Sequence, residues 1–426
     1  MHLVIVTSGS RGDVQPYLAL ALRAQRGGHR VTLATHEGFR PWVEQLGLPF
    51  RALHGDPKGM LSAPGAGAWL ADGSRMGLVR FAREFGREFT GLFDGLLADM
   101  TAVTADADLI VHGMVCMAAT QLHEVRGTPV MGGWLAPLTP TRAFPVAGLT
   151  CRTPRSRWEE RRNWVSHLVG EQLLWQPSRT TVNRWRRGTL HTTPLPFFGP
   201  FAAQRSADYP VCYAYSPAVL PRPVDWPEWI APTGWWYLDE PAFTPSAALA
   251  AFLAAGDAPV TIGFGSMTPP DGEWLTRVVL EACERAECRA ILLQGWGTLG
   301  HSALPTWAHV ERDVPHAWLY PRSSAIVHHG GAGTTGAAVR SGVPQVIVPL
   351  GFDQQFWGSR LNEMGVSPPP IRRRDLTVTR LTSALRTALT DSRLRAAAAA
   401  LGEIVRLEDG TGVALARIEA HFAHSC

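Results

Sequence analysis

Residues 325–335 read Ala-Ile-Val-His-His-Gly-Gly-Ala-Gly-Thr-Thr, and this stretch decides the fold. The apolar residues and His328 predict a buried strand, the glycines predict a tight turn, and the residues that follow, through about Arg340, predict a helix. A strand that turns directly into a helix is the repeating unit of a parallel α/β sheet. Free backbone N–H groups and the positive end of the helix dipole meet at such a turn, which therefore predicts a diphosphate site.

The side chains of His329 and Thr334 can add hydrogen bonds to that diphosphate. The structural alternative is a tight turn that binds nothing. Two adjacent histidines at the carboxyl end of the strand, where open α/β sheets bind ligands, favour a binding site. The stretch lacks the Gly-Lys-[Ser/Thr] of a triphosphate P-loop and the full Gly-x-Gly-x-x-Gly of a dinucleotide site, so it indicates another class of nucleotide.

Residues 342–355 complete this unit with a strand at 345–348 followed by Gly351-Phe352-Asp353-Gln354-Gln355. Asp353 and Gln354 come just beyond the strand's carboxyl end, and a carboxylate and an amide there suit the hydroxyls of a sugar. A second interpretation stays open, because Asp is a favoured N-cap residue and Asp353 suits the start of the next helix.

The same alternation of short apolar runs and helical segments occurs in both halves of the chain, which implies two parallel sheets. The expected strands are 3–6, 31–34, 109–112 and 129–131 in the first half, and 260–264, 290–293, 325–328 and 345–348 in the second. Residues 217–245 contain seven prolines, too many for a long helix or a central strand. We predict an α/β architecture with a first domain at 1–220, a proline-rich linker at 221–245 and a second domain at 246–408.

The composition excludes several classes of protein. The chain has 426 residues, of which 46% are hydrophobic and 18% charged, so it is not disordered as a whole. A net charge of +4 is too small to make nucleic acid the expected partner. The first apolar run is soon interrupted by Arg11 and Asp13, so we expect a strand there and not an export signal, and no apolar run approaches the roughly 20 residues of a membrane span. The six cysteines lack Cys-x-x-Cys spacing, which favours a cytoplasmic protein.

Four segments together resemble the GT-B glycosyltransferases that use nucleotide sugars, and within them the bacterial glycopeptide-antibiotic and sterol 3-β-glucosyltransferase-like branch. They are Ser-Gly-Ser-Arg-Gly-Asp-Val-Gln-Pro at 8–16, Thr-Gly-Trp-Trp at 233–236 leading to Gly-Phe-Gly-Ser-Met at 263–267, the block 328–335, and Phe-Asp-Gln at 352–354. The resemblance implies two Rossmann-like domains that face a cleft, with the donor mainly on the second and the acceptor mainly on the first. It also implies that a C-terminal helix, within 409–426, crosses back to the first domain.

The resemblance further implies which residues hold the donor. His329 is expected to contact the diphosphate, and Asp353 and Gln354 are expected to hold the hexose. Val314 is expected to offer backbone hydrogen bonds to the base, with His316 beside it. The rest of the diphosphate cradle is expected from Ser10, Ser266, Gly331, Ala332, Gly333 and Thr334.

The ribose contacts stay open. Plant relatives carry a ribose-binding glutamate eight residues after the phosphate histidine, and Ala337 occupies that position here. The choice between a UDP and a TDP donor stays open with it.

Asp13 is the expected catalytic base. It lies in the loop after the first strand, and transfer of a sugar with inversion needs a group that takes the proton of the acceptor hydroxyl. The antibiotic and sterol branches resemble this chain in offering an aspartate there, whereas plant relatives generally use a histidine. Two alternatives remain: Asp13 N-caps the helix entered through Pro16, or Asp353 is the base.

No metal ion is expected, because a helix N-terminus and His329 can stabilise the departing diphosphate. The Asp106-Ala107-Asp108 triplet matches the Asp-x-Asp of metal-dependent glycosyltransferases, but it precedes the strand at 109–112. That order places it at the opposite edge of the sheet. We expect no cofactor other than the UDP-sugar, which is a co-substrate.

These observations predict an inverting, metal-independent enzyme that moves a hexose, glucose by preference, from a UDP-sugar to a hydroxyl of a sterol, triterpenoid, polyketide or lipid. The 16 tryptophans favour an apolar acceptor. The alternatives are a TDP-sugar-dependent natural-product glycosyltransferase, a sugar-nucleotide epimerase, and a non-catalytic homologue that activates a partner enzyme.

Residues 152–187 hold nine arginines against three glutamates, interleaved with Trp158, Trp164, Trp175 and Trp185. The favoured interpretation is a helix whose tryptophans pack inward while its arginines face water. The alternative is a peripheral membrane contact, in which this region docks on anionic headgroups.

Overall fold

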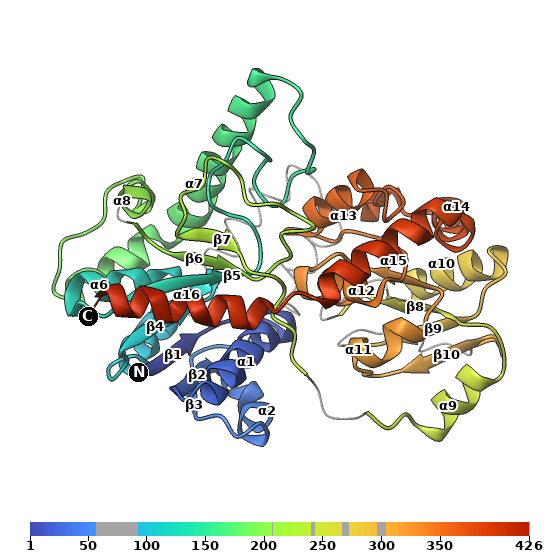
Figure 1. Ribbon diagram of the computed structural model, residues 1–426, viewed down its shortest axis with the longest axis horizontal. Helices are drawn as coiled ribbons and strands as arrows, with labels where there is room; N and C mark the ends of the chain where they lie inside the picture. Colours follow the sequence, from blue (N-terminus) through green and yellow to red (C-terminus); the bar gives the residue numbers. More distant parts are fainter. Residues whose placement is uncertain (57–92, 207, 240–242, 266–271, 296–303, 426) are drawn as a thin grey trace.

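The computed structural model describes residues 1–56, 93–206, 208–239, 243–265, 272–295 and 304–425. It consists of two parallel sheets flanked by helices, which lie side by side (Figure 1). The first sheet has the strand order β3-β2-β1-β4-β5-β6-β7 and the second β10-β9-β8-β11-β12, and every pairing is parallel. The predicted α/β architecture with two parallel sheets is confirmed.

The strands of the first sheet are mostly buried, as expected where helices cover both faces of a sheet. They are β1 (His2–Val6), β2 (Arg30–His36), β3 (Phe50–Leu53), β4 (Leu109–His112), β5 (Val130–Trp134), β6 (Val211–Tyr213) and β7 (Ile230–Pro232). β7 falls within the range predicted as a linker. It is the edge strand and ends on a proline, which an edge tolerates because its outer N–H groups are not needed for pairing.

The helices of this half are α1 (Arg11–Arg26), α2 (Arg40–Gln45), an unlabelled helix at 93–103, α6 (Thr120–Arg126), α7 (Arg157–Gly188) and α8 (Phe201–Ser206), with short 3₁₀ turns at Glu37–Phe39 and Met114–Ala119. The sequence also predicts an amphipathic helix over 76–97. Its last residues are helical, with Leu96 buried, and residues 76–92 lie outside the described ranges.

The second half repeats the alternation. Its strands are β8 (Val260–Gly263), β9 (Ala290–Leu293), β10 (Ala308–Glu311), β11 (Ala325–His328) and β12 (Gln345–Ile347). Its helices are α9 (Ala247–Ala254), α10 (Gly272–Arg285), α11 (His316–Leu319), α12 (Ala332–Ser341), α13 (Gln354–Glu363), α14 (Val378–Thr390) and α15 (Ser392–Arg406), with 3₁₀ turns at Tyr320–Arg322 and Arg373–Asp375. Across the described ranges, no helix combines the length and the apolarity needed to cross a bilayer.

The last helix, α16 (Gly410–Ser425), crosses back and packs on α1 of the first domain (Figure 1). Its first residue must be small, because a Cβ on Gly410 would lie 2.4 Å from the carbonyl oxygen of Trp235. Leu415 and Ile418 are buried in the shared core, and Arg23 of α1 pairs with Asp409 at 2.8 Å.

One continuous apolar core joins the two domains. Trp357 of α13 is fully buried and makes an edge-to-face contact with Tyr215 of the first domain, with ring centroids 5.4 Å apart. Phe356 makes a similar contact with Phe144 at 5.6 Å. This packing holds the carboxyl end of β12 against the first domain.

Candidate active site

The glycine-rich turn after β11 has the predicted shape. β11 ends at His328, and α12 begins at Ala332 with Gly331 as its N-cap residue. Gly331 offers no side-chain cap, so it leaves the N–H groups of the first helical turn available to a ligand. Gly330 is required, because its φ is +92° and a Cβ there would lie 2.8 Å from Cγ2 of Ile347.

His328 is a structural residue that shapes this turn. Its Nδ1 accepts a hydrogen bond from the N–H of Gly330 at 3.0 Å, which leaves the proton on Nε2. Nε2 then donates to Oε1 of Gln345 at 2.8 Å. Burial lowers the pKa of His328 to about 4, so the ring is neutral and both its nitrogens are occupied.

His329 lies in the turn between β11 and α12, and its contact with a diphosphate stays a prediction. Its ring fits between two glycines, since a Cβ on Gly331 would lie 2.5 Å from Nε2 and a Cβ on Gly265 would lie 3.2 Å from Cε1. Nδ1 is buried and has no hydrogen-bond partner among the described residues. Burial lowers the pKa of His329 to about 3, with His328 and His316 adding to the effect. The ring is therefore neutral near pH 7, and its Nδ1 is left unpaired by the described residues.

The N-terminus of α1 faces the N-terminus of α12 across the domain boundary. A Cβ on Gly333 would lie 4.0 Å from the carbonyl oxygen of Gly12, and Arg11 pairs with Asp313 at 2.7 Å. Burial and the nearby charge of Arg11 lower the pKa of His316 to about 3. The N-termini of two helices therefore meet at this junction, and the N-terminus of a helix favours an anionic ligand.

Asp13 lies in the first turn of α1. Its Oδ2 accepts hydrogen bonds from the backbone N–H of Ser10 at 2.8 Å and from the Ser10 hydroxyl at 3.0 Å. Burial raises the pKa of Asp13, and the two bonds from Ser10 oppose that rise. The carboxylate thus belongs to a capping box in which Ser10 is the N-cap residue and Asp13 the third helical residue, so the alternative that Asp13 itself N-caps the helix is wrong. The Ser10 hydroxyl is engaged with Asp13, and its contact with a diphosphate stays a prediction.

Asp353 occupies the N-cap position of α13, but its carboxylate does not cap the helix. Oδ2 accepts a 2.7 Å hydrogen bond from the indole N–H of Trp357 instead. Burial raises the pKa of Asp353 to about 6; the Trp357 bond opposes this, and the charge of Asp13 adds to it. Asp353 and Asp13 therefore interact across the two domains.

Gln354 is buried and holds the loop before α13. Its Oε1 accepts hydrogen bonds from the N–H groups of Leu350 at 2.7 Å and Gly351 at 3.1 Å. The side-chain oxygen of Gln354 is therefore occupied by backbone N–H groups. The predicted contact between Gln354 and the hexose would have to be made by its side-chain nitrogen.

Two polar atoms that the sequence did not single out are buried nearby. Thr335 Oγ1 on α12 and Gln355 Oε1 on α13 have no hydrogen-bond partner within the described part of the chain. Buried polar atoms normally have partners, so their position in the first turns of these two helices favours a polar ligand there.

The predicted base-binding segment precedes α11. The Val314 side chain is buried, and in the described ranges neither backbone group of Val314 is hydrogen-bonded. The His316 ring stacks on Tyr320, with centroids 4.4 Å apart. Ala332 is buried and Thr334 partly exposed, whereas Ser266 lies outside the described residues. The contacts of these residues with a nucleotide stay predictions.

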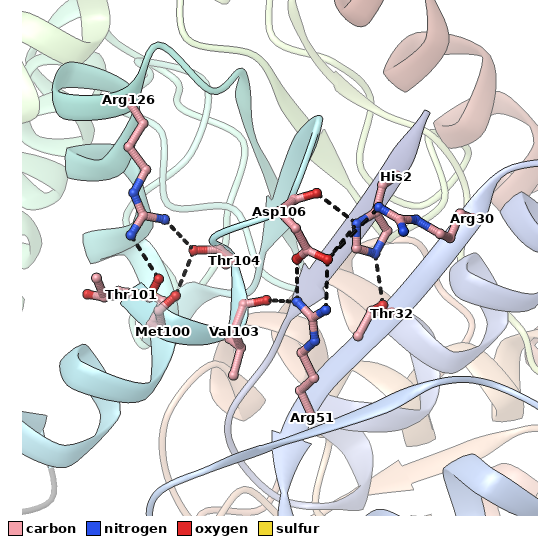
Figure 2. Close-up of polar contacts among 10 residues, drawn as sticks. All are labelled: His2, Arg30, Thr32, Arg51, Met100, Thr101, Val103, Thr104, Asp106 and Arg126. Carbon is pink, nitrogen blue, oxygen red and sulfur yellow. Dashed lines mark hydrogen bonds and ion pairs between the residues drawn. The ribbon is translucent and has the colours of Figure 1, made fainter.

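The Asp-x-Asp triplet lies at the other edge of the first sheet, where it was expected. Arg51 donates two hydrogen bonds, of 2.6 and 2.9 Å, to the carboxylate of Asp106 (Figure 2). Nδ1 of His2 lies 3.5 Å from Oδ2 of the same carboxylate. Arg51 holds the pKa of Asp106 well below its usual range. Asp108 accepts a bond from the N–H of His2. Both carboxylates therefore fix the start of β1, far from α12.

Two family profiles match the chain. The glycosyltransferase family 28 N-terminal domain covers residues 3–145, and the erythromycin biosynthesis protein CIII-like C-terminal domain covers residues 293–407. The second match contains the turn after β11 and Asp353.

The sterol 3-beta-glucosyltransferases of Emericella nidulans and Aspergillus fumigatus are each 36% identical to this chain over 98% of its length. The chain spans 30% of the length of each of these relatives.

Solved glycosyltransferases share the fold along the whole chain. The glycosyltransferase of kitacinnamycin has a TM-score of 0.69 at 18% identity, and the spinosyn forosaminyltransferase SpnP has 0.68 at 17%; in both cases 99% of each chain is covered. VinC, solved in complex with dTDP, has a TM-score of 0.65 at 18% identity, also with 99% of each chain covered. The first part of the chain thus matches a glycosyltransferase family 28 N-terminal domain, and the chain has the fold of the GT-B glycosyltransferases along its whole length.

Proposed function

We propose that this chain transfers a hexose from a nucleotide diphosphate sugar to a hydroxyl of a sterol-like or other apolar acceptor, with inversion and without a metal ion. The observation that carries the proposal is the meeting of three groups from two domains. The uncapped N-terminus of α12, the neutral ring of His329 and the carboxylate of Asp13 all lie at the junction of the sheets.

The proposed reaction assigns each group one task. The acceptor oxygen bonds to the anomeric carbon while the bond from that carbon to the diphosphate oxygen breaks. Asp13 takes the acceptor's proton, and its raised pKa makes it a stronger base than an exposed aspartate. The N–H groups of α12 and His329 receive the negative charge that develops on the leaving diphosphate. Asp353 accepts hydrogen bonds from the hexose hydroxyls.

We propose UDP-glucose as the donor because relatives with 36% identity are named sterol 3-beta-glucosyltransferases. A TDP-sugar is the second candidate, since VinC and SsfS6 were solved with thymidine diphosphate. These two solved relatives share only the fold with this chain, whereas the glucosyltransferases share more than a third of its residues.

We place the reaction in the cytoplasm, next to a membrane. The five cysteines that the structure describes are free thiols, as a reducing compartment keeps them. Sterol-like acceptors partition into bilayers, so an enzyme that uses them works at a membrane surface.

The test is a transfer assay with UDP- and TDP-sugars against a panel of sterols and polyketides, with and without a chelator. We expect a β-glucoside from UDP-α-glucose, with the same rate in the chelator. A free sugar or an epimerised donor as the only product, with every acceptor in the panel, would contradict the proposal. A chain that merely activates a partner enzyme would turn over no donor in this assay.

A further inference from the structure

α7 carries an exposed apolar stripe that no part of the described chain covers. Trp158, Val165, Val169 and Leu173 are 68%, 54%, 52% and 54% exposed. Their spacings of seven, four and four residues place them on one side of the helix. The predicted inward packing is confirmed for Trp175 and Trp185, which are buried, but is wrong for Trp158. In Figure 1 the N-terminal end of α7 projects beyond both sheets.

Two exposed phenylalanines extend the stripe. Phe197 and Phe198 are 58% and 70% exposed and contact each other edge to face, with centroids 5.2 Å apart. They are held against the helix because the Trp175 indole donates to the carbonyl of Phe197 at 2.8 Å and Gln172 donates to the carbonyl of Phe198 at 3.0 Å. We call these six residues, Trp158, Val165, Val169, Leu173, Phe197 and Phe198, the α7 face.

Positive charge gathers at the end of the α7 face that carries Trp158. Five arginines there are exposed: Arg152, Arg155, Arg157, Arg161 and Arg162. In the part of the chain that the structure describes, none of the five forms an ion pair with a side chain. Only Glu159 and Glu160 oppose them within 152–162, and the guanidinium of Arg162 lies 5.4 Å from the Trp158 ring centroid.

We propose that the α7 face docks on the surface of a bilayer that contains anionic lipids. Indole rings are favoured at the boundary between headgroups and acyl chains, and exposed arginines bind phosphates. Each basic residue near an anionic leaflet adds to the attraction. A second copy of this chain carries the same arginines, so it does not complement the charge as anionic headgroups do.

The docked surface is connected to the proposed active site. On its inner side α7 holds the segment 138–151, where Asn163 donates to the carbonyl of Arg142 at 3.1 Å and Ser166 accepts from the N–H of Val146. The same segment reaches α13, because the N–H of Cys151 donates to Ser359 at 2.7 Å. α7 therefore separates a bilayer at the α7 face from a segment that reaches the neighbour of Asp353, where a Cβ on Gly148 would lie 3.4 Å from the carbonyl oxygen of Phe352. This link rests on the proposed function, whereas the docking itself does not.

The test is co-sedimentation of the full chain with vesicles of phosphatidylcholine, with and without phosphatidylserine, at low and high salt. Two variants probe the α7 face: Trp158→Ala with Val169→Asp removes apolar contacts, and Arg161→Gln with Arg162→Gln removes charge. The matched control is Arg393→Gln with Arg395→Gln, which removes the same charge from exposed positions on α15.

We expect the wild-type chain and the control to bind the phosphatidylserine vesicles at low salt. Loss of Arg161 and Arg162 should lower the partition coefficient by roughly tenfold or more, and salt should weaken wild-type binding. Equal binding by all variants, or none by the wild type, overturns the proposal. The proposal is also overturned if sedimentation velocity shows a dimer that only the α7 variants break, because the α7 face then binds a second copy of this chain. Transfer to a water-soluble acceptor is measured in parallel, so that failure of the proposed chemistry is distinguished from failure of docking.

Discussion

Asp13 and Asp353 come from different domains, yet their carboxylates lie close enough to interact. Burial raises the pKa of Asp353 to about 6, and the negative charge of Asp13 contributes to that rise. Burial raises the pKa of Asp13 as well. The charge of Asp13 therefore disfavours the charged form of Asp353, although burial is the larger cause of the raised pKa. This suits a site in which one carboxylate accepts a proton while the other meets neutral sugar hydroxyls.

The first prediction concerns this pair. Asp13→Asn removes a negative charge, so the pKa of Asp353 should fall from about 6 toward its ordinary value. The shift can be followed by carboxyl carbon NMR on aspartate-labelled protein. Asp106→Asn is the matched control, because Asp106 lies at the opposite edge of the sheet and is paired with Arg51. A pKa of Asp353 that is the same in all three proteins would contradict the proximity.

The second prediction concerns the indole that holds Asp353. Trp357→Phe keeps an aromatic ring but removes the donor, and because that bond favours the charged carboxylate, the pKa of Asp353 should rise. A raised pKa keeps Asp353 protonated to higher pH. A rate that needs the charged carboxylate falls as the pH drops through this pKa, so in Trp357→Phe that fall should begin at a higher pH than in the wild type. Trp226→Phe serves as control, since its buried indole donates to the carbonyl of Pro140 and not to a titrating group. If both variants gave one pH profile, Trp357 would be only a packing residue.

His329 should recognise the diphosphate and not the base. His329→Ala removes one hydrogen-bonding group from the site, so affinity for UDP should fall by about 1–3 kcal/mol. Affinity for uridine, which has no phosphate, should stay the same. Isothermal titration calorimetry with both ligands measures the difference. If His329→Ala lost the same affinity for UDP as for uridine, His329 would not contact the diphosphate.

Calorimetry also tests the protonation of His329. The pKa of this ring is about 3 in the protein alone, and a bound diphosphate should raise it. UDP binding should then take up protons at a pH between the two values. In wild-type protein the heat of binding should vary with the ionisation enthalpy of the buffer, and in His329→Ala that variation should shrink.

Gly330 should be less tolerant of a side chain than other left-handed glycines. Gly330→Ala adds a Cβ that would lie 2.8 Å from Ile347, whereas Gly127→Ala, also at positive φ, meets nothing within 4 Å. Backbone strain of about 1 kcal/mol is common to both variants, and only Gly330→Ala adds a clash. Chemical denaturation should show the larger loss of stability for Gly330→Ala. Similar losses of stability in the two variants would mean that the turn after β11 can shift to make room for the added Cβ.

Local sequence was enough to predict much of the fold. β4, β9 and β11 have the predicted bounds, because each is a run of apolar residues that is buried whatever surrounds it. β3, β6, β7 and β10 were not predicted. They have three or four residues, and pairing with a neighbouring strand is what makes them strands.

The candidate site was predictable in part. The turn at Gly330 and Gly331 follows from local pattern, and the bond from Trp357 to Asp353 could have been read from their spacing of four residues at a helix start. The pairing of Arg11 with Asp313 and the interaction of Asp13 with Asp353 could not. Each joins residues more than 300 positions apart, and their distance depends on how the two domains pack.

The central claim is that Asp13 removes the acceptor proton while the helix N-terminus at Gly331 holds the leaving diphosphate. The most direct test is the turnover of Asp13→Asn together with its affinity for UDP, because the asparagine oxygen can still accept the bonds from Ser10 that shape the loop. We predict that kcat falls by about 10²–10⁴-fold while the Kd for UDP is unchanged. Turnover close to that of the wild type, with the same Kd, would contradict the account.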